Sequence, residues 1–212
     1  MIEAVIFDMD GTLLNTLDDL KDSVNFVMQM FNFPLRTRDE VRCFVGNGVN
    51  LLFERAVPKG VDNQTIKKCV EMFKKHYSKN MYNHTAPYNG ILEVLKILKS
   101  GGVKIGIVSN KFDKAVKKMS EKYFGELIDI VVGQADDVPQ KPSPEGVLKV
   151  MKILGVVSAV YVGDSDVDII TAKNANLQSI GVSWGFRNRN TLKNADFIAD
   201  TPVELMEIIK KL

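Results

Sequence analysis

The sequence predicts an α/β fold, a doubly wound and mostly parallel sheet into which an all-helical domain is inserted, and three observations predict it. Residues 2–7 form a short apolar segment rich in β-formers, which predicts a strand. Residues 16–81 then place apolar side chains at helical spacing and have little β-signal. From Pro87 onward, strand-like and helix-like segments alternate, which favours parallel strands joined by right-handed crossovers.

The inserted segment is predicted to be helical throughout. Its first helix has Leu17, Leu20, Val24 and Val27 at helical spacing, and Pro34 ends it. The predicted helices cover residues 16–33, 38–45, 50–56 and 63–81. The expected domain division is an α/β core of residues 1–14 and 86–212 and a helical domain of residues 15–85.

The rest of the core is predicted to alternate between helices and strands. The expected helices cover residues 90–99, 111–122, 144–154 and 202–211, with a further one from just after Ser165 to about Asn174. The expected strands cover residues 103–108, 128–132, 159–162 and 178–182, with a short edge strand at 197–198. Together with the first strand, these elements predict a Rossmann-like core covered by helices on both faces.

Composition excludes several classes of protein. The chain has 212 residues, 45% of them hydrophobic and 25% charged, which is typical of a soluble globular protein. Its net charge of +2 argues against nucleic acid as a partner. With no apolar run long enough to span a bilayer and a first segment that is a strand, we expect no membrane association and a cytoplasmic location. Cys43 and Cys69 are then expected to be free thiols.

Two acids follow the first strand directly. Asp8 and Asp10 lie in Asp8-Met9-Asp10-Gly11-Thr12, where an extended backbone would point both carboxylates the same way. Ligands of open α/β sheets bind at the carboxyl ends of the strands. Two carboxylates sharing a small space there either hold a cation or share a proton. This pattern indicates chemistry at the end of the first strand.

Three later segments carry possible partners for these acids. Ser109 follows a predicted strand, Lys141 lies in Gln140-Lys141-Pro142, and Asp164 and Asp168 follow the strand 159–162. The motifs Asp-x-Asp-Gly-Thr, Ser, Lys and Gly-Asp-Ser-x-x-Asp resemble, in kind, order and spacing, those of the haloacid dehalogenase superfamily of phosphotransferases. The helical insertion is similar to the cap domain of many members. Closure of this cap about hinges near residues 13–15 and 86–87 would exclude water.

The resemblance implies a nucleophile and a general acid. Asp8 corresponds to the residue that attacks phosphorus and forms an aspartyl phosphate, which water then hydrolyses. Asp10 would protonate the leaving oxygen and later activate the water, for which its neighbours must raise its pKa. The dehalogenase branch lacks this second acid, so Asp10 favours phosphoryl transfer.

The same resemblance implies residues that bind the phosphate group. Ser109 and Asn110 would donate hydrogen bonds to phosphate oxygens, and Lys141 would supply a fixed positive charge. Thr12 is either a further phosphate-binding residue or a structural one that caps the next segment or bonds to Asp10.

The acids also predict a Mg²⁺ site. Carboxylates of Asp8 and Asp164, the backbone carbonyl of Asp10 and several waters would form an octahedral set of hard oxygen ligands. Asp168 is a further acid of the site, either a direct ligand or a residue that supports one. The cation would let a carboxylate approach a negatively charged phosphate.

The predicted cap carries the signal for substrate choice. Phe44-Val45-Gly46-Asn47-Gly48-Val49, Val108-Ser109-Asn110-Lys111 and Gly181-Val182-Ser183-Trp184-Gly185-Phe186 resemble the phosphoglycolate phosphatase branch. For a small phosphorylated carboxylate, Asn47 and Gly48 would offer backbone N–H groups, and Arg42 or Arg55 a guanidinium. The alternative is a loop that joins helices, with two solvated arginines. Asn15-Thr16 and Ser143 depart from the usual pattern of this branch, which weakens the named substrate.

Three functions remain open at the level of sequence. The favoured one is a Mg²⁺-dependent phosphatase acting on a small phosphate monoester, with phosphoglycolate as the candidate. The second is a sugar phosphomutase of the same superfamily. The third is a non-catalytic protein that binds anions, which is disfavoured because both Asp8 and Asp10 are present. The expected partner is a small phosphorylated metabolite, and the sequence leaves monomer or homodimer open.

Overall fold

A computed structural model describes residues 2–212, and its core is a parallel sheet. Within those residues the main sheet has six strands in the order β5-β4-β1-β6-β7-β8, each pair parallel. The strands are β1 (Ala4–Phe7), β4 (Lys104–Phe112), β5 (Ile130–Gln134), β6 (Ala159–Gly163), β7 (Gln178–Val182) and β8 (Phe197–Ala199). The predicted fold class is therefore confirmed.

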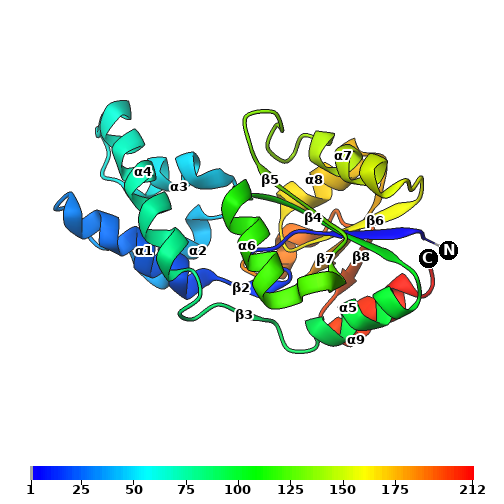
Figure 1. Ribbon diagram of the computed structural model, residues 1–212. Helices are drawn as coiled ribbons and strands as arrows, with labels where there is room; N and C mark the ends of the chain where they lie inside the picture. Colours follow the sequence, from blue (N-terminus) through cyan, green and yellow to red (C-terminus); the bar gives the residue numbers. More distant parts are fainter. Residues whose placement is uncertain (1) are drawn as a thin grey trace.

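Helices cover both faces of this sheet (Figure 1). One face packs against α5 (Ile91–Ser100), α6 (Asp113–Phe124) and α9 (Pro202–Ile209), the other against α7 (Glu145–Leu154) and α8 (Asp166–Asn174). Strand β1 shows why both faces are apolar. Val5 and Phe7 belong to the first cluster and Ala4 and Ile6 to the second, because successive side chains of a strand point to opposite faces.

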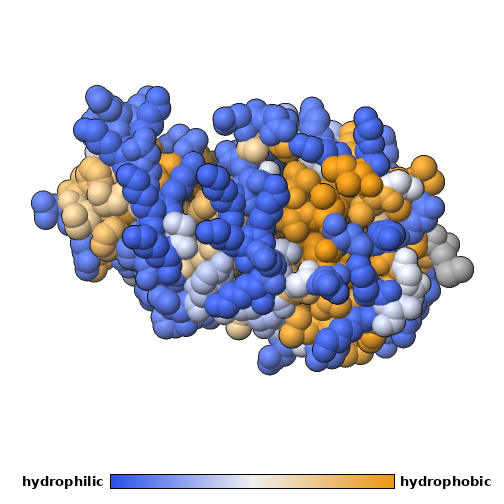
Figure 2. All heavy atoms as spheres, in the orientation of Figure 1, coloured by the Kyte–Doolittle hydropathy of each residue, from blue (hydrophilic) through white to orange (hydrophobic). Residues whose placement is uncertain are grey.

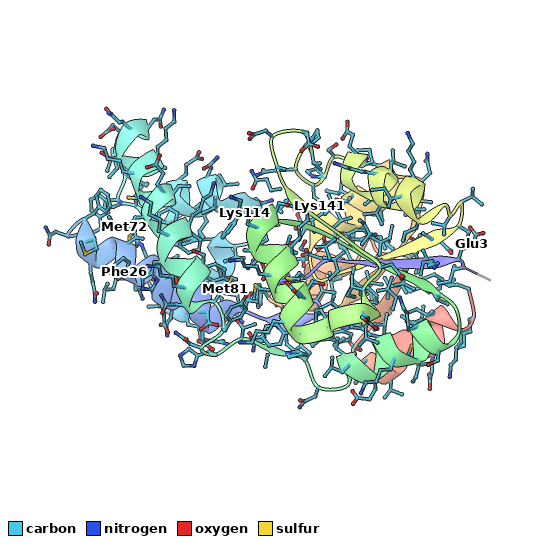
Figure 3. All side chains as sticks on the ribbon, in the orientation of Figure 1. Glu3, Phe26, Met72, Met81, Lys114 and Lys141 are labelled. Carbon is cyan, nitrogen blue, oxygen red and sulfur yellow. The ribbon has the colours of Figure 1, made fainter. Side chains whose placement is uncertain are left out.

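The inserted segment forms a group of helices beside the carboxyl end of β1 (Figure 1). These are α1 (Leu17–Met30), α2 (Arg38–Phe44), α3 (Gly48–Ala56) and α4 (Asn63–Asn80). Phe53, Phe73 and Tyr77 lie in its interior, with centroid distances of 5.3 Å from Phe73 to each of the other two rings. Figure 3 labels Phe26 and Met72 in the same group, which we call the cap. The expected domain boundaries stay a prediction.

Two short strands connect the cap to the core. β2 (Leu14–Asn15) pairs antiparallel with β3 (Ala86–Pro87), so the two connections lie side by side. The Asp19 carboxylate of α1 accepts hydrogen bonds from the backbone N–H groups of His84 and Thr85 and from the Thr85 hydroxyl. The expected hinges coincide with this paired segment.

The sequence placed the end of one strand wrongly. We expected a strand to end at Val108 and a helix to begin at Lys111, but β4 continues to Phe112. After an irregularity beyond Val108, Phe112 pairs with Gln134 of β5, which keeps the backbone extended. Consequently Ser109, Asn110 and Lys111 lie within a strand.

The surface agrees with the composition. Hydrophilic side chains cover most of the near face over α4 and α6, and apolar surface gathers over the core side of the view (Figure 2). Among residues 2–212, no helix is both long enough and apolar enough to cross a membrane. Both cysteines are free, as predicted. Cys69 is buried, whereas Cys43 is exposed.

Candidate active site

A cavity of about 60 Å³ lies between the carboxyl ends of the strands and the cap. The core contributes mainly polar residues to its wall: Asp8, Asp10, Ser109, Asn110, Lys111, Phe112, Asp164, Ser165, Phe186 and Arg187. The cap contributes mainly apolar ones: Leu20, Val45, Gly46, Gly48, Val49, Leu52, Phe73 and Tyr77. The fold therefore brings the predicted motif residues Asp8, Asp10, Ser109 and Asp164 to one cavity.

Lys141, which Figure 3 labels, is a buried cation beside the cavity residue Asp8. Its ammonium lies 3.0 Å from the Asp8 carboxylate and donates to the Asp168 carboxylate at 2.7 Å and the Tyr161 hydroxyl at 3.0 Å. Burial alone would lower the pKa of Lys141, but the charges of Asp168 and Asp8 outweigh it and raise that pKa. Lys141 is thus held as a cation at the end of β1.

Asp168 has both carboxylate oxygens engaged. One accepts from Lys141, and the other accepts from the backbone N–H of Ser165 at 3.0 Å and from its hydroxyl at 2.6 Å. The Ser165 hydroxyl accepts in turn from the Asp168 backbone N–H, which completes a capping box at the start of α8. The helix cap therefore orients the carboxylate that holds Lys141.

Asp8 and Asp164 are buried close together, and nearby positive charge does not fully compensate the negative charge of their carboxylates. Burial is the main cause that raises the pKa of Asp8 to about 6, and repulsion from Asp168 and Asp10 adds to it. Burial and repulsion from Asp168 and Asp8 raise the pKa of Asp164 to about 8. Among the described residues, Asp8 Oδ1 has no partner in hydrogen-bond geometry, although Lys141 is near.

This arrangement fits a hard divalent cation. Asp8, Asp164 and Asp168 each offer an oxygen, and these oxygens lie within 4.8 Å of one another. Carboxylate oxygens are the ligands that Mg²⁺ prefers, and a cation would relieve the repulsion between them. Because the oxygens of Asp168 are already hydrogen-bonded, Asp8 and Asp164 are the better candidates for direct ligands.

Asp10 is paired with Lys111, a residue to which the motifs assign no role. The Lys111 ammonium lies 3.0 Å from both carboxylate oxygens of Asp10 and donates to the Tyr77 hydroxyl of the cap at 2.8 Å. The Thr16 hydroxyl also donates to Asp10, at 2.8 Å. Asp10 is therefore held by a core cation that also contacts the cap.

The predicted phosphate-binding residues have different surroundings. Ser109 is buried and lines the cavity. Asn110 also lines it, but its amide accepts from the Lys141 backbone N–H and donates to the carbonyls of Lys141 and Gly46. Thr12 is buried outside the lining, and its hydroxyl has no hydrogen-bond partner within residues 2–212.

Of the cap residues predicted to bind substrate, some line the cavity and others do not. Gly48 lines the cavity. In the part of the chain that the structure describes, the lining does not include Arg42, Asn47 or Arg55. Arg55 donates to the Phe44 carbonyl and to the Asn47 side chain, and Arg42 pairs with Asp39 on the surface.

Sequence reasoning gave no role to Lys111, Tyr77, Tyr161 and Arg187, which contact predicted residues or line the cavity beside them. Lys111 directly follows Ser109-Asn110, which could have marked it as a site residue. Because a helix was predicted to begin at Lys111, its side chain was not expected to face the site. Tyr77 and Tyr161 resemble ordinary buried aromatic residues of a helix and a strand. Arg187 lies beyond the last motif, and only the folded chain brings it to the cap.

Known proteins show the same architecture over almost the whole chain. A family model described as haloacid dehalogenase-like hydrolase matches residues 5–182. The phosphoglycolate phosphatase of Aquifex aeolicus is 31% identical over 211 residues, 98% of this chain and 97% of that relative. The phosphoglycolate phosphatase of Psychrobacter arcticus is 34% identical over 196 residues, 87% of this chain and 84% of that relative. The crystal structure of a candidate phosphoglycolate phosphatase from Lactobacillus delbrueckii subsp. bulgaricus has a TM-score of 0.93 and 33% identity, covering 99% of both chains.

Proposed function

Because the chain belongs to the haloacid dehalogenase-like hydrolase family, as its motifs predicted, we propose that it is a Mg²⁺-dependent phosphatase acting on small phosphate monoesters. The single observation that carries the proposal is the position of Lys141, which contacts both Asp8 and Asp168 at the end of β1. This arrangement supplies a carboxylate nucleophile beside a fixed positive charge, as phosphoryl transfer requires.

In the first step, an Asp8 carboxylate oxygen attacks phosphorus and the bond from phosphorus to the leaving oxygen breaks. Lys141, 3.0 Å from Asp8, stabilises the negative charge that develops on the phosphoryl oxygens. Ser109 at the cavity wall donates its hydroxyl to one of those oxygens. The product on the protein is an aspartyl phosphate.

Asp10 transfers the protons of both steps. It donates a proton to the leaving alcohol oxygen, then accepts one from the water that attacks the aspartyl phosphate and frees inorganic phosphate. Asp10 lines the cavity two residues from Asp8, and its hydrogen bond from Thr16 orients it. The Lys111 ammonium must leave at least one Asp10 oxygen free for these transfers.

A bound Mg²⁺ would neutralise negative charge between the Asp8 carboxylate and the phosphate group. Asp8 and Asp164 would hold it through their carboxylates and Asp10 through its backbone carbonyl. Asp168 acts on the site through Lys141, because its oxygens already accept hydrogen bonds from Lys141 and Ser165.

Phosphoglycolate is the candidate substrate, since relatives that this chain matches over most of its length carry that name. Its carboxylate needs a positive partner inside the cavity. Lys111 lines the cavity and meets this need better than Arg42 and Arg55, which lie outside the lining. A carboxylate bound to Lys111 would also compete with Asp10 for that ammonium.

Release of inorganic phosphate from a panel of small esters, phosphoglycolate included, tests the proposal. The parent, Asp8→Asn and the control Asp166→Asn are compared with Mg²⁺ and with EDTA. Asp166 is an exposed acid on the same motif segment as Asp164, so its loss leaves the cavity intact. We expect turnover that needs Mg²⁺ in the parent and control and is lost in Asp8→Asn.

Two results would contradict the proposal. One is the absence of phosphate release from every ester with Mg²⁺ present. The other is undiminished turnover in Asp8→Asn, which would exclude Asp8 as the nucleophile. Isomerisation of a sugar phosphate that requires an added sugar bisphosphate and frees no inorganic phosphate would favour a mutase instead.

A further inference from the structure

Arg187 lines the cavity and connects the core to the cap. It follows β7 in the segment Ser183–Arg187, and its guanidinium donates to the backbone carbonyls of Arg42 and Val45 in the cap. A Cβ on Gly46 would lie 3.2 Å from Arg187 Nη2, so the guanidinium lies against this turn. One side chain of the core thus holds the junction between α2 and α3, residues 42–48.

The chemistry of that junction suits a cation. Arg42 lies in the last turn of α2 and Val45 follows its end, where helix carbonyls lack partners within the helix. A guanidinium satisfies two such carbonyls at once and interacts favourably with the negative end of the helix dipole. Moved away from Arg187, the junction would lose both hydrogen bonds.

At its other end, the segment that carries Arg187 is anchored to the predicted metal site. The backbone N–H of Phe186 donates to the Asp164 carboxylate at 2.6 Å. The Trp184 indole donates to the Thr12 carbonyl at 3.1 Å. Gly185 packs so closely on Asp164 and the Gly11 carbonyl that a Cβ there would overlap them. The segment that carries the Arg187 side chain therefore has little room to move.

A second core residue, Asn110, also binds a backbone carbonyl of the same junction. The Asn110 amide donates to the Gly46 carbonyl at 3.1 Å and also binds the backbone of Lys141. Each core residue that binds the junction is thus also connected to a residue of the site. Arg187 is connected to Asp164 through the neighbouring Phe186, and Asn110 binds Lys141 directly. The same set of hydrogen bonds therefore fixes both the position of the cap and the geometry of the site.

We propose that Arg187 is a positioning residue that latches residues 42–48 of the cap over the cavity, so that the cap closes against the same segment that orients Asp164. The inference concerns the site of the proposed function and rests on it. The latch stabilises the closed cap, in which Val45, Gly46, Gly48 and Val49 wall the cavity. Without Arg187 the closed state loses two charge-assisted hydrogen bonds and the cap opens more often.

Amide hydrogen exchange of residues 42–48 tests the latch in the metal-free protein, without substrate. Arg187→Gln and Arg187→Lys are compared with the control Arg189→Gln, two positions away. The Arg189 side chain is 58% exposed and pairs with Asp200. We expect exchange at residues 42–48 to rise about tenfold or more in Arg187→Gln, and less in Arg187→Lys. The control should exchange as the parent does.

Kinetics supply a second readout. We expect KM for the preferred ester to rise in Arg187→Gln by about tenfold. Equal exchange of residues 42–48 in Arg187→Gln, Arg189→Gln and the parent would overturn the latch. If the parent hydrolyses no ester while Arg187→Gln still exchanges faster, the proposed function fails and the latch stands, so the two failures are distinguishable.

Discussion

The ammonium of Lys111 lies 3.0 Å from each carboxylate oxygen of Asp10, although 101 positions separate the two residues. Lys111 is nearly inaccessible, with 3% of its side chain exposed, against 13% for Asp10. It also donates to Tyr77, so these contacts connect the segment after β1, the strand β4 and the cap helix α4. A charge pair this sheltered from solvent is costly to break from one side only.

Replacing Lys111 by Met should leave the Asp10 carboxylate without its partner. We expect the free energy of unfolding to fall by about 3 kcal/mol. Tyr77→Phe removes one neutral partner of the ammonium and should cost about 1 kcal/mol. Urea unfolding at neutral pH measures both. Equal losses in the two variants would contradict the view that the Lys111–Asp10 pair dominates this cluster.

Asp164 and Asp168 should respond differently to amide substitution. We expect Asp164→Asn to abolish the rise in Tm that Mg²⁺ causes, because it removes a direct ligand. The metal-free variant should stay as stable as the parent, since burial raises the pKa of Asp164 and disfavours its charge. Thermal unfolding with and without Mg²⁺ gives both results.

Asp168→Asn should keep most of the Mg²⁺-induced rise in Tm. It should lower kcat at least about tenfold, because Lys141 loses its 2.7 Å partner and its orientation. A variant that loses the Mg²⁺ effect as completely as Asp164→Asn would show that Asp168 is a direct ligand after all.

Gly185→Ala should disturb the site without changing any charge. Its Cβ would overlap Asp164 and the Gly11 carbonyl, so Asp164 must shift. We expect the Mg²⁺-induced rise in Tm to shrink and activity to fall. Gly101→Ala is the matched control, since its Cβ would lie 3.4 Å from the nearest atom, the Leu98 carbonyl oxygen. Unchanged Mg²⁺ binding in Gly185→Ala would contradict this packing argument.

Asp196 should make stability depend on pH in the acid range. Hydrogen bonds from the backbone N–H and then the hydroxyl of Ser179 lower the pKa of its carboxyl group. Because the folded state lowers this pKa, the stabilisation is present above the unfolded value of about 3.9 and is lost as pH falls through the folded value. The stability difference between the parent and Asp196→Asn should therefore be constant from pH 7 to 5 and shrink below pH 4. Urea unfolding across that range checks it, and a difference that grows on acidification would contradict the sign.

Local patterns were sufficient for the class of fold and for the centre of the site. Alternating apolar segments placed strands and helices within a few residues, and strand ends carried Asp8, Ser109 and Asp164 to one edge of the sheet. The end of β4 was misplaced because its last residues stay extended only through pairing with Gln134 of another strand. Lys111 was therefore assigned to a helix instead of being recognised as the partner of Asp10.

By itself, the sequence determined the parallel α/β core, the helical insertion and the motif residues that meet at the strand ends. These follow from periodicity and from the rule that parallel strands end at one edge, which need only neighbours along the chain. Only the tertiary structure decided that Lys111 pairs with Asp10, that Asp168 holds Lys141, and that Arg187 binds the cap from the core. Those contacts depend on which long polar side chains meet when distant segments pack, and their spacing along the chain contains no trace of that meeting.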